Sequence, residues 1–249
     1  MFAIIHEDAD LLVVNKPAGL VCHPTKGDEF SSLISRARLY LTSTLNPQPS
    51  THLINRLDRE TSGVVLIAKN PETAGELGKI LESRAVEKEY LAIVHGHVAT
   101  GQRIIDAPLG KDESSRVAIK DCVRPDGAPA QTEFFVEQNF SRPSTLNPQP
   151  STFSLLRLRP RTGRKHQIRL HLAHLGHPVV GDKLYGGDED LYLALVQNRL
   201  TGGQRARLIF ENHALHARSI KFLWRGRPLE FSCEPEPWFT KFLSVDYTD

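Results

Sequence analysis

Asp58 lies between two arginines, Arg56 and Arg59, in the stretch 54–63, which reads INRLDRETSG. A carboxylate beside guanidinium groups is expected to have a lowered pKa and to stay ionised at neutral pH. An ionised carboxylate can act as a nucleophile or stabilise a cation that develops at a sugar carbon, but it is a poor general acid. A structural Asp–Arg ion pair that holds a turn together is the alternative, and the residue types alone leave both interpretations open.

A second group of charged residues lies between positions 155 and 181, where the sequence has six lysines or arginines, four histidines and no aspartate or glutamate. Part of this group falls in RPRTGRKH, where a proline and a glycine bend the backbone just before a predicted helix. This stretch begins with Arg159, and the basic residues of the turn itself are Arg161, Arg164, Lys165 and His166. A basic turn that leads into a helix N-terminus can bind phosphate groups. The alternative is a solvated basic surface.

The histidines in this segment raise the question of a metal site. His171 and His174 lie on neighbouring faces of the predicted helix, but no carboxylate joins them, a His-Glu-x-x-His motif is absent, and the neighbouring basic residues oppose a divalent cation. The sequence also contains no Gly-x-Ser-x-Gly, no phosphate-binding loop and no dinucleotide fingerprint. We therefore expect no metal and no other cofactor.

Composition places the chain among ordinary globular proteins. It has 249 residues, 40% of them hydrophobic, and a formal net charge of only +2, so a basic surface must come from local clustering. Three widely spaced cysteines do not suggest a disulfide framework. The N-terminal sequence lacks the pattern of a signal peptide, and no apolar run approaches the length of a spanning helix. We expect a cytoplasmic protein.

One nonamer, STLNPQPST, occurs twice, at 43–51 and at 144–152. The sequences that flank the two copies differ, and the nonamer has two prolines and no apolar periodicity, which favours short loop insertions over a domain duplication. A recognition loop is the alternative, although the nonamer contains no basic residue.

The elements that must position these residues can be predicted from periodicity. Asn70 and Pro71 are typical of a helix start, and they predict a helix over 71–84 with Ala74, Leu77 and Leu81 on its apolar face. A change to helical spacing predicts a second helix over 165–176, with Ile168, Leu172 and Leu175 on one face and Gly176 at its end. A short helix is also expected at 31–41, and strands at 11–15, 63–69, 88–96, 131–140, 153–161 and 214–224.

Strands dominate, and no regular βαβ alternation appears. The predicted fold class is α+β, with a mixed, mostly antiparallel central sheet flanked by helices. We expect a single catalytic domain over 1–249, with two lobes around a catalytic cleft.

Several blocks of the sequence, in the same order, resemble the RluA-type RNA pseudouridine synthase family. They cover most of the chain and read LLVVNKPAGLVCHP, RLDRETSG, KEYLAIVHG, TGRKHQIRLHLAHLGHPVVGDKLYG and LHARSIKF. One departure is Asn55, where members of the family commonly have histidine before Arg-Leu-Asp. The resemblance implies the pseudouridine synthase fold, and it implies that this chain lacks the accessory RNA-binding domain that many relatives carry in front.

The resemblance also implies a reaction, the isomerisation of uridine to pseudouridine in RNA by an aspartate nucleophile acting on a flipped base. Asp58 would be the nucleophile, Tyr90 the active-site tyrosine and Arg169 the arginine that pairs with the aspartate. Arg56 would enter the space that the target base leaves. The implied partner is a stem–loop or bulged uridine in ribosomal or transfer RNA, bound by a monomer with no membrane contact. The alternative is a non-catalytic RNA-binding protein on the same scaffold.

Overall fold

The computed structural model describes residues 2–24, 32–44, 50–143 and 151–244, and the chain divides into two compact units. Unit 1 comprises residues 1–88 and 216–249, and unit 2 comprises residues 89–215. Most of both nonamers lies outside the described residues, so their assignment as loop insertions stays a prediction. The single two-lobed domain also stays a prediction.

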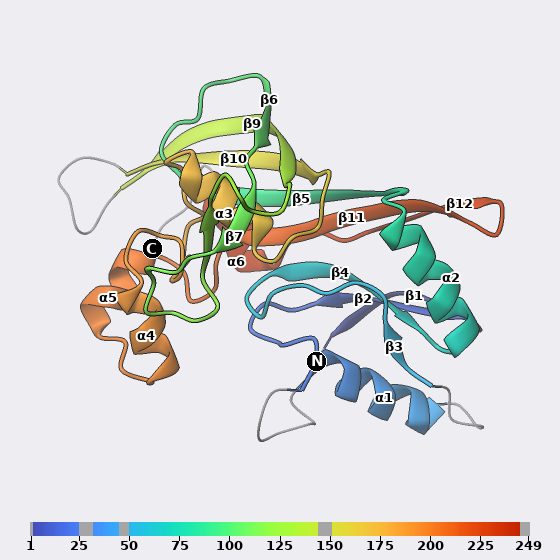
Figure 1. Cartoon of the computed structure of the whole chain (residues 1–249). Helices are drawn as coiled ribbons and strands as arrows, with labels where there is room; N and C mark the ends of the chain where they lie inside the picture. Colours follow the sequence, from blue (N-terminus) through green and yellow to red (C-terminus); the bar gives the residue numbers. More distant parts are fainter. Residues whose placement is uncertain (1, 25–31, 45–49, 144–150, 245–249) are drawn as a thin grey trace. The chain divides into compact units, whose positions relative to one another are not determined.

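Unit 1 is built on strands in the order β1-β2-β4-β11, with β3 paired to β4 and β12 paired to β11 (Figure 1). Every one of these pairings is antiparallel except β4 with β11, which is parallel. The strands are β1 (Ala3–Glu7), β2 (Leu11–Lys16), β3 (His52–Leu53), β4 (Ser62–Ala68), β11 (Leu215–Trp224) and β12 (Arg227–Ser232), and the helices are α1 (Leu33–Thr44), α2 (Pro71–Glu82) and α6 (Pro237–Leu243).

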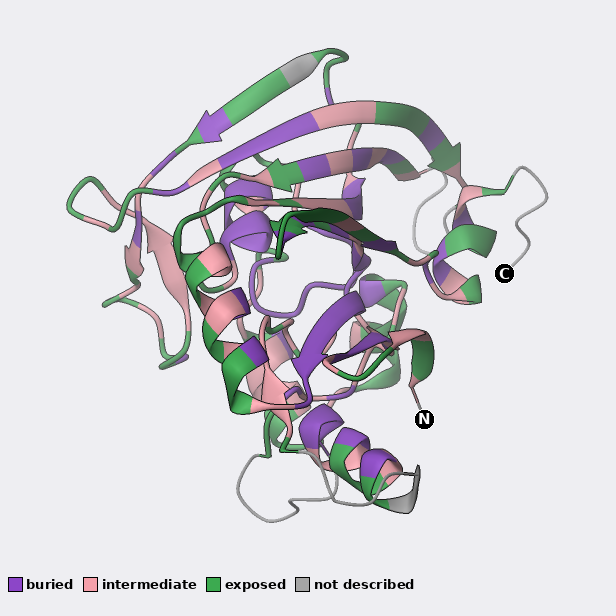
Figure 2. Ribbon diagram, turned by 90° about the vertical axis from the view of Figure 1, so that its right-hand side faces the viewer, coloured by how far each residue is buried: buried purple, intermediate pink, exposed green. Residues whose placement is uncertain are grey.

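Alternate residues of β2 and β4 enter two different hydrophobic clusters, as the two-residue period of a strand requires. Leu12, Val14 and Val65 pack with α1, whereas Leu11 and Val13 pack with Leu77 of α2 and with residues of β11 and β12. Helices α1 and α2 therefore cover opposite faces of this sheet (Figure 1), and β4 is buried along its whole length (Figure 2). A strand buried on both faces explains the unbroken apolar run VVLIA.

Unit 2 has the strand order β5-β10-β9-β6 and a separate antiparallel pair, β7-β8. All of these pairings are antiparallel. The strands are β5 (Val86–His95), β6 (Gln102–Asp106), β7 (Leu109–Lys111), β8 (Asp121–Val123), β9 (Gln131–Arg142) and β10 (Ser151–Pro160), and the helices are α3 (Gln167–His174), α4 (Asp190–Val196) and α5 (Gly202–Leu208). The chain passes between the units at 88–89 and again at 215–216.

The predicted mixed, mostly antiparallel arrangement of strands is confirmed, and most of the predicted elements are present. Asn70 caps α2 as expected, because its side chain accepts a hydrogen bond from the Thr73 backbone N–H at 2.8 Å. The predicted apolar face of α3 is partly wrong, since Leu175 is 41% exposed while Arg169 and His171 are buried. These two polar side chains are buried because each has specific polar partners in unit 2.

Candidate active site

Asp58 lies on the segment between β3 and β4 in unit 1, and Asn55 fixes the start of that segment. The Asn55 amide donates to the Val64 carbonyl at 3.1 Å, and its oxygen accepts from the Leu66 N–H at 2.8 Å. Asp58 itself is half-buried, and its carbonyl accepts from the Thr61 N–H in a turn that leads into β4. The residue that departs from the family pattern thus ties the Asp58 segment to a fully buried strand.

A lysine that the sequence analysis did not single out lies against the same segment. Lys16, at the end of β2, has no exposed surface, and its Nζ donates to the carbonyls of Pro17, Leu20 and Arg59 at 2.8–3.1 Å. Burial lowers the pKa of Lys16 to about 8, although nearby negative charge, including that of Asp58, opposes the shift. A cation therefore lies close enough to Asp58 for the two charges to interact.

Cys22 and Arg59 connect the turn after β2 to the Asp58 segment. The Cys22 thiol makes two contacts of 3.4 Å with Leu57, one with the backbone N–H and one with the carbonyl. Arg59 Nε donates to the Gly19 carbonyl at 3.2 Å. Together with Lys16, these contacts join the blocks NKPAGLVC and RLDRETSG, which the sequence places 30 or more residues apart.

Ser62 and Gly63, which close the motif, connect it to β11. Gly63 has φ of +119°, and a Cβ at this position would lie 2.2 Å from the Ala217 carbonyl oxygen, so the two strands approach too closely for any other residue. The Ser62 hydroxyl donates to Nδ1 of His216 at 2.9 Å, and Nε2 of His216 donates to the Cys233 carbonyl at 3.0 Å. Burial lowers the pKa of His216, which favours this neutral form.

Arg169 lies in the first turn of α3 in unit 2 and makes a two-point ion pair with Asp182. The guanidinium Nε and Nη2 donate to the two carboxylate oxygens at 2.7 and 2.9 Å, and the guanidinium carbon lies 5.2 Å from the centre of the Tyr185 ring. Burial of Asp182 opposes ionisation, but the charge and hydrogen bonds of Arg169 hold the pKa of that carboxyl well below its usual range. The orientation of Arg169 is therefore fixed within unit 2 by a residue that the sequence analysis did not consider.

Tyr90, on β5, is half-buried and lies opposite Leu158 of β10. Tyr90 and Arg169 belong to unit 2, whereas Asp58 and Arg56 belong to unit 1, where Arg56 is exposed. The pairing of Asp58 with Arg169 thus stays a prediction, as does the meeting of Asp58 with Tyr90.

The basic turn contains no acidic residue in its own sequence, but acidic residues of neighbouring elements contact it in the folded protein. Arg161 pairs with Glu133 at 2.8 Å, and Lys165 pairs with Asp121 at 2.9 Å. Arg164 donates to the Pro129 carbonyl at 3.2 Å. The side chains of Arg161 and Lys165 are still 59% and 51% exposed, so they remain accessible to a phosphate group.

His166 and the buried Tyr185 join this turn to Arg169. Nδ1 of His166 lies 3.0 Å from the Tyr185 hydroxyl, which also accepts from the Asp121 N–H at 3.2 Å. His166 has φ of +54° at the N-cap of α3, so its ring turns back toward Tyr185 while the helix begins at the next residue. The buried ring of Tyr185 therefore touches both the predicted catalytic arginine and the predicted RNA-binding turn.

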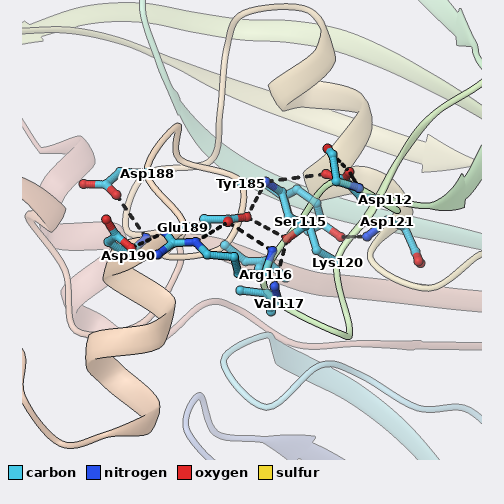
Figure 3. Close-up of polar contacts among 12 residues, drawn as sticks. Asp112, Ser115, Arg116, Val117, Lys120, Asp121, Tyr185, Asp188, Glu189 and Asp190 are labelled. Carbon is cyan, nitrogen blue, oxygen red and sulfur yellow. Dashed lines mark hydrogen bonds and ion pairs between the residues drawn. The ribbon is translucent and has the colours of Figure 1, made fainter.

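A polar network beside Tyr185 anchors the loop between β7 and β8, as Figure 3 shows. Glu189 accepts from the Ser115 hydroxyl at 2.6 Å and from Lys120 at 3.1 Å, and it also pairs with Arg116. The hydrogen bonds from Ser115 and Lys120 lower the pKa of Glu189 to about 2. The loop is thus held against the segment that carries Tyr185.

The histidines of the segment have separate partners. His171 is buried and bonds to the Thr132 hydroxyl and the Ala107 carbonyl, and Nδ1 of His177 bonds to the His95 carbonyl. Within the described ranges, no three His, Cys, Asp or Glu side chains come together as a metal site would require. Across the same ranges, no helix is long and apolar enough to cross a membrane.

Comparisons with known proteins agree on one family. Residues 10–174 match the family model described as RNA pseudouridylate synthase. Ribosomal large subunit pseudouridine synthase D of Haemophilus ducreyi is 37% identical over 88% of this chain, and an uncharacterized RNA pseudouridine synthase of Bacillus subtilis is 33% identical over 88%. The chain spans 62% and 63% of the length of these two relatives.

Solved structures give the same result for the fold. Human RNA pseudouridylate synthase domain containing 1 has a TM-score of 0.72 and 26% identity, with 95% of this chain and 84% of the human chain covered. Human RNA pseudouridylate synthase domain containing 4 has a TM-score of 0.69 and 27% identity, with coverage of 96% and 90%. These similarities confirm the predicted fold.

Proposed function

Because the chain belongs to the RNA pseudouridylate synthase family, we propose that it isomerises uridine to pseudouridine in RNA. In this reaction the bond between C1′ and N1 breaks and a bond between C1′ and C5 forms. The uracil loses its C5 proton and gains a proton at N1, so atoms and electrons balance within the substrate. The observation that carries the proposal is the position of Asp58, half-buried on a segment that Asn55, Lys16 and Cys22 fix within unit 1.

Each proposed catalytic residue has a role that its chemistry supports. Asp58 acts as the nucleophile, and the charge of Lys16 lies close enough to interact with its carboxylate. Tyr90 stacks on the uracil and assists removal of the C5 proton. Arg169, held by Asp182, presents a guanidinium of fixed orientation to the aspartate, a pairing that requires the two units to meet.

A uridine inside a helix must leave the stack before its glycosidic bond can be reached, which costs a few kcal/mol. Arg56 is exposed and planar, so it can enter the vacated space and stack on the neighbouring bases. RNA loops and bulges expose bases more readily than regular helices do. We therefore propose a stem–loop or bulged uridine as the target, bound further by Arg161, Arg164, Lys165 and His166.

We propose ribosomal RNA as the substrate class, acted on in the cytoplasm, because several similar bacterial proteins are named as synthases of the ribosomal large subunit. A non-catalytic RNA-binding protein is the alternative. It would keep the basic turn but would not need Asp58, Tyr90 and Arg169 together.

Replacement of Asp58 by asparagine tests the proposal. Asp58→Asn keeps the shape of the side chain and removes the nucleophile, so tritium release from RNA labelled at C5 of uridine should fall to background. RNA affinity should change less than about threefold, because the basic residues remain. Asp126→Asn, at a 68% exposed carboxylate in unit 2, is the control and should keep full activity. Full activity in Asp58→Asn would refute the role of Asp58, and RNA binding without tritium release by the unaltered protein would favour the alternative.

A further inference from the structure

A cavity of about 440 Å³ lies in unit 1 among α1, β3 and the segment after Cys22. Its size falls in the range of small-ligand sites. Three of the described residues that line it are basic or can become so, namely His23, Arg38 and His52, and none of the described lining residues is acidic. The charge of this cavity therefore suits an anionic ligand.

Arg38 differs from the arginines of the basic turn. Arg161 pairs with a carboxylate, whereas the described parts of the chain give Arg38 no carboxylate partner. Arg38 is exposed on α1, so a ligand would not have to displace any carboxylate of the described residues from it. A guanidinium can bind a phosphate group through two parallel hydrogen bonds.

The rest of the lining suits a base and a sugar. Ile34 and Leu53 supply an apolar floor that continues into the core of unit 1. The imidazole rings of His23 and His52 can stack on a base, as aromatic side chains do in RNA-binding proteins. Thr51 also lines the cavity, and its buried Oγ1 has no hydrogen-bond partner among the described residues. Rotation of this hydroxyl would let it bond to a polar group of a ligand.

The cavity lies close to Asp58 along the chain. Leu53 precedes Asp58 by five residues, so the two are separated by at most about 17 Å even in a fully extended chain. Both residues belong to unit 1, so this limit depends on nothing outside that unit. An RNA with its target uridine at Asp58 would thus have a neighbouring nucleotide within reach of the cavity.

We propose that this cavity binds a nucleotide that flanks the target uridine, with the phosphate on Arg38 and the base over Ile34 and Leu53 between the two histidines. The inference rests on the proposed function, because it takes RNA as the substrate. It assigns unit 1 a share in choosing which uridine is modified.

Two variants test the site by RNA binding. Arg38→Gln should raise the Kd for a hairpin RNA about tenfold and reduce the slope of log K against log salt by about 1, as the loss of one phosphate contact predicts. Arg36→Gln, on the same helix but outside the cavity lining, is the matched control and should change Kd less than about twofold. Equal effects of the two variants would overturn the inference.

The Thr51→Val variant distinguishes a role of Thr51 in ligand binding from a role in stability. The buried hydroxyl has no partner within the described chain, so its removal should not lower the thermal midpoint, yet it should raise the Kd for RNA with no change in salt slope. A lower midpoint with unchanged Kd would show that Thr51 is structural and would count against the site.

Photo-crosslinking with 4-thiouridine beside the target position completes the test, with Asp58→Asn as the host so that turnover does not alter the RNA. Crosslinks in peptides that contain α1 or β3 support the site, and crosslinks found only in unit 2 overturn it. If the unaltered protein makes no pseudouridine but Arg38→Gln still weakens binding, the proposed function fails while the cavity stands as an RNA site. If activity is normal and Arg38→Gln binds as tightly as the unaltered protein, the cavity inference alone fails.

Discussion

Two ionisable side chains close to the proposed catalytic residues are removed almost completely from solvent, one in each unit. Lys16 in unit 1 donates to three backbone carbonyls, and Asp182 in unit 2 accepts from Arg169 and from the N–H groups of Leu184 and Tyr185. A buried charge is tolerated only where such partners replace water. Both side chains therefore hold backbone and catalytic groups in defined positions, and their effects on stability can be measured.

Asp182→Asn should lower the free energy of unfolding by about 3–5 kcal/mol, because it removes the carboxylate that makes a two-point ion pair with the buried guanidinium of Arg169. Urea denaturation with circular dichroism measures the change. The pKa of Asp182 is lower in the folded than in the unfolded state, so its stabilising effect is present above pH 4 and is lost as the pH falls below that value. The difference between the unaltered protein and the variant should shrink accordingly. Asp126→Asn, at an exposed ion pair with Arg124, should change little at any pH, and an equal loss there would contradict the assignment.

Lys16 should produce a pH dependence in the alkaline range. Its pKa is about 8 in the folded protein against 10.5 in the unfolded chain, so between these values the unfolded state holds a proton that the folded state has released. Stability relative to Lys16→Met should therefore rise from pH 8 to pH 10.5, by up to about 3 kcal/mol. Urea denaturation of both proteins at several pH values in this range measures the trend. A constant or falling difference would show that burial does not lower the pKa of Lys16 in the folded protein.

At the scale of elements, the motif residues owe their positions to strand contacts that act over long stretches of sequence. Gly63→Ala should destabilise the protein by about 3 kcal/mol or more, because its Cβ would collide with the Ala217 carbonyl and its φ is unfavourable for alanine. Gly75→Ala is the matched control, since a Cβ on this helical residue meets nothing within 4 Å. The Gly75→Ala variant should have a free energy of unfolding about 0.5–1 kcal/mol higher than that of the unaltered protein. Thermal unfolding of both variants measures the difference, and similar midpoints would contradict the close approach of β4 and β11.

Sequence periodicity was sufficient to predict the long helices and strands, but it did not predict the short ones. Strands β2, β4, β9 and β10 and helices α2 and α3 have clear periods or caps, and they were predicted to within a few residues. Strands β7 and β8 have three residues each, too few to show a period, and α4 to α6 have seven each. Strand β12, RPLEFS, begins with the exposed residues Arg227 and Pro228, and it pairs with β11.

In the candidate site, residues that belong to a sequence motif could be predicted, whereas residues that act through tertiary contacts could not. Asp58, Tyr90 and Arg169 were predicted from motifs, but their supporting residues were not. Lys16 donates a hydrogen bond to the carbonyl of Arg59, 43 positions away, and the thiol of Cys22 accepts one from the backbone N–H of Leu57, 35 positions away. Asp182 follows directly after the basic segment 155–181. Such residues become recognisable only when tertiary contacts show what they touch.

At the scale of the whole molecule, the small net charge of +2 conceals how the basic side chains are distributed. Arg157 lies between Glu89 and Glu137, whereas Arg161 and Lys165 of the turn each pair with one carboxylate. Ion pairs at an exposed surface are weak, so a phosphate can compete for one partner. A basic residue held by two carboxylates is less available to RNA than one held by a single carboxylate. The turn can therefore bind RNA even though its charge is partly balanced.

A double variant, Arg161→Gln with Lys165→Gln, tests this view of the turn. If each residue contacts one phosphate, the slope of log K against log salt should fall in magnitude by about 1.4–1.8, and RNA affinity at moderate salt should fall at least about tenfold. Arg157→Gln is the control, because its guanidinium is held by two carboxylates, and it should change the slope by less than one phosphate contact. Fluorescence anisotropy across a salt series gives both quantities. An unchanged slope in the double variant would place the phosphate contacts elsewhere, whereas an equal change in Arg157→Gln would mean that ion pairing does not decide which basic residues meet the RNA.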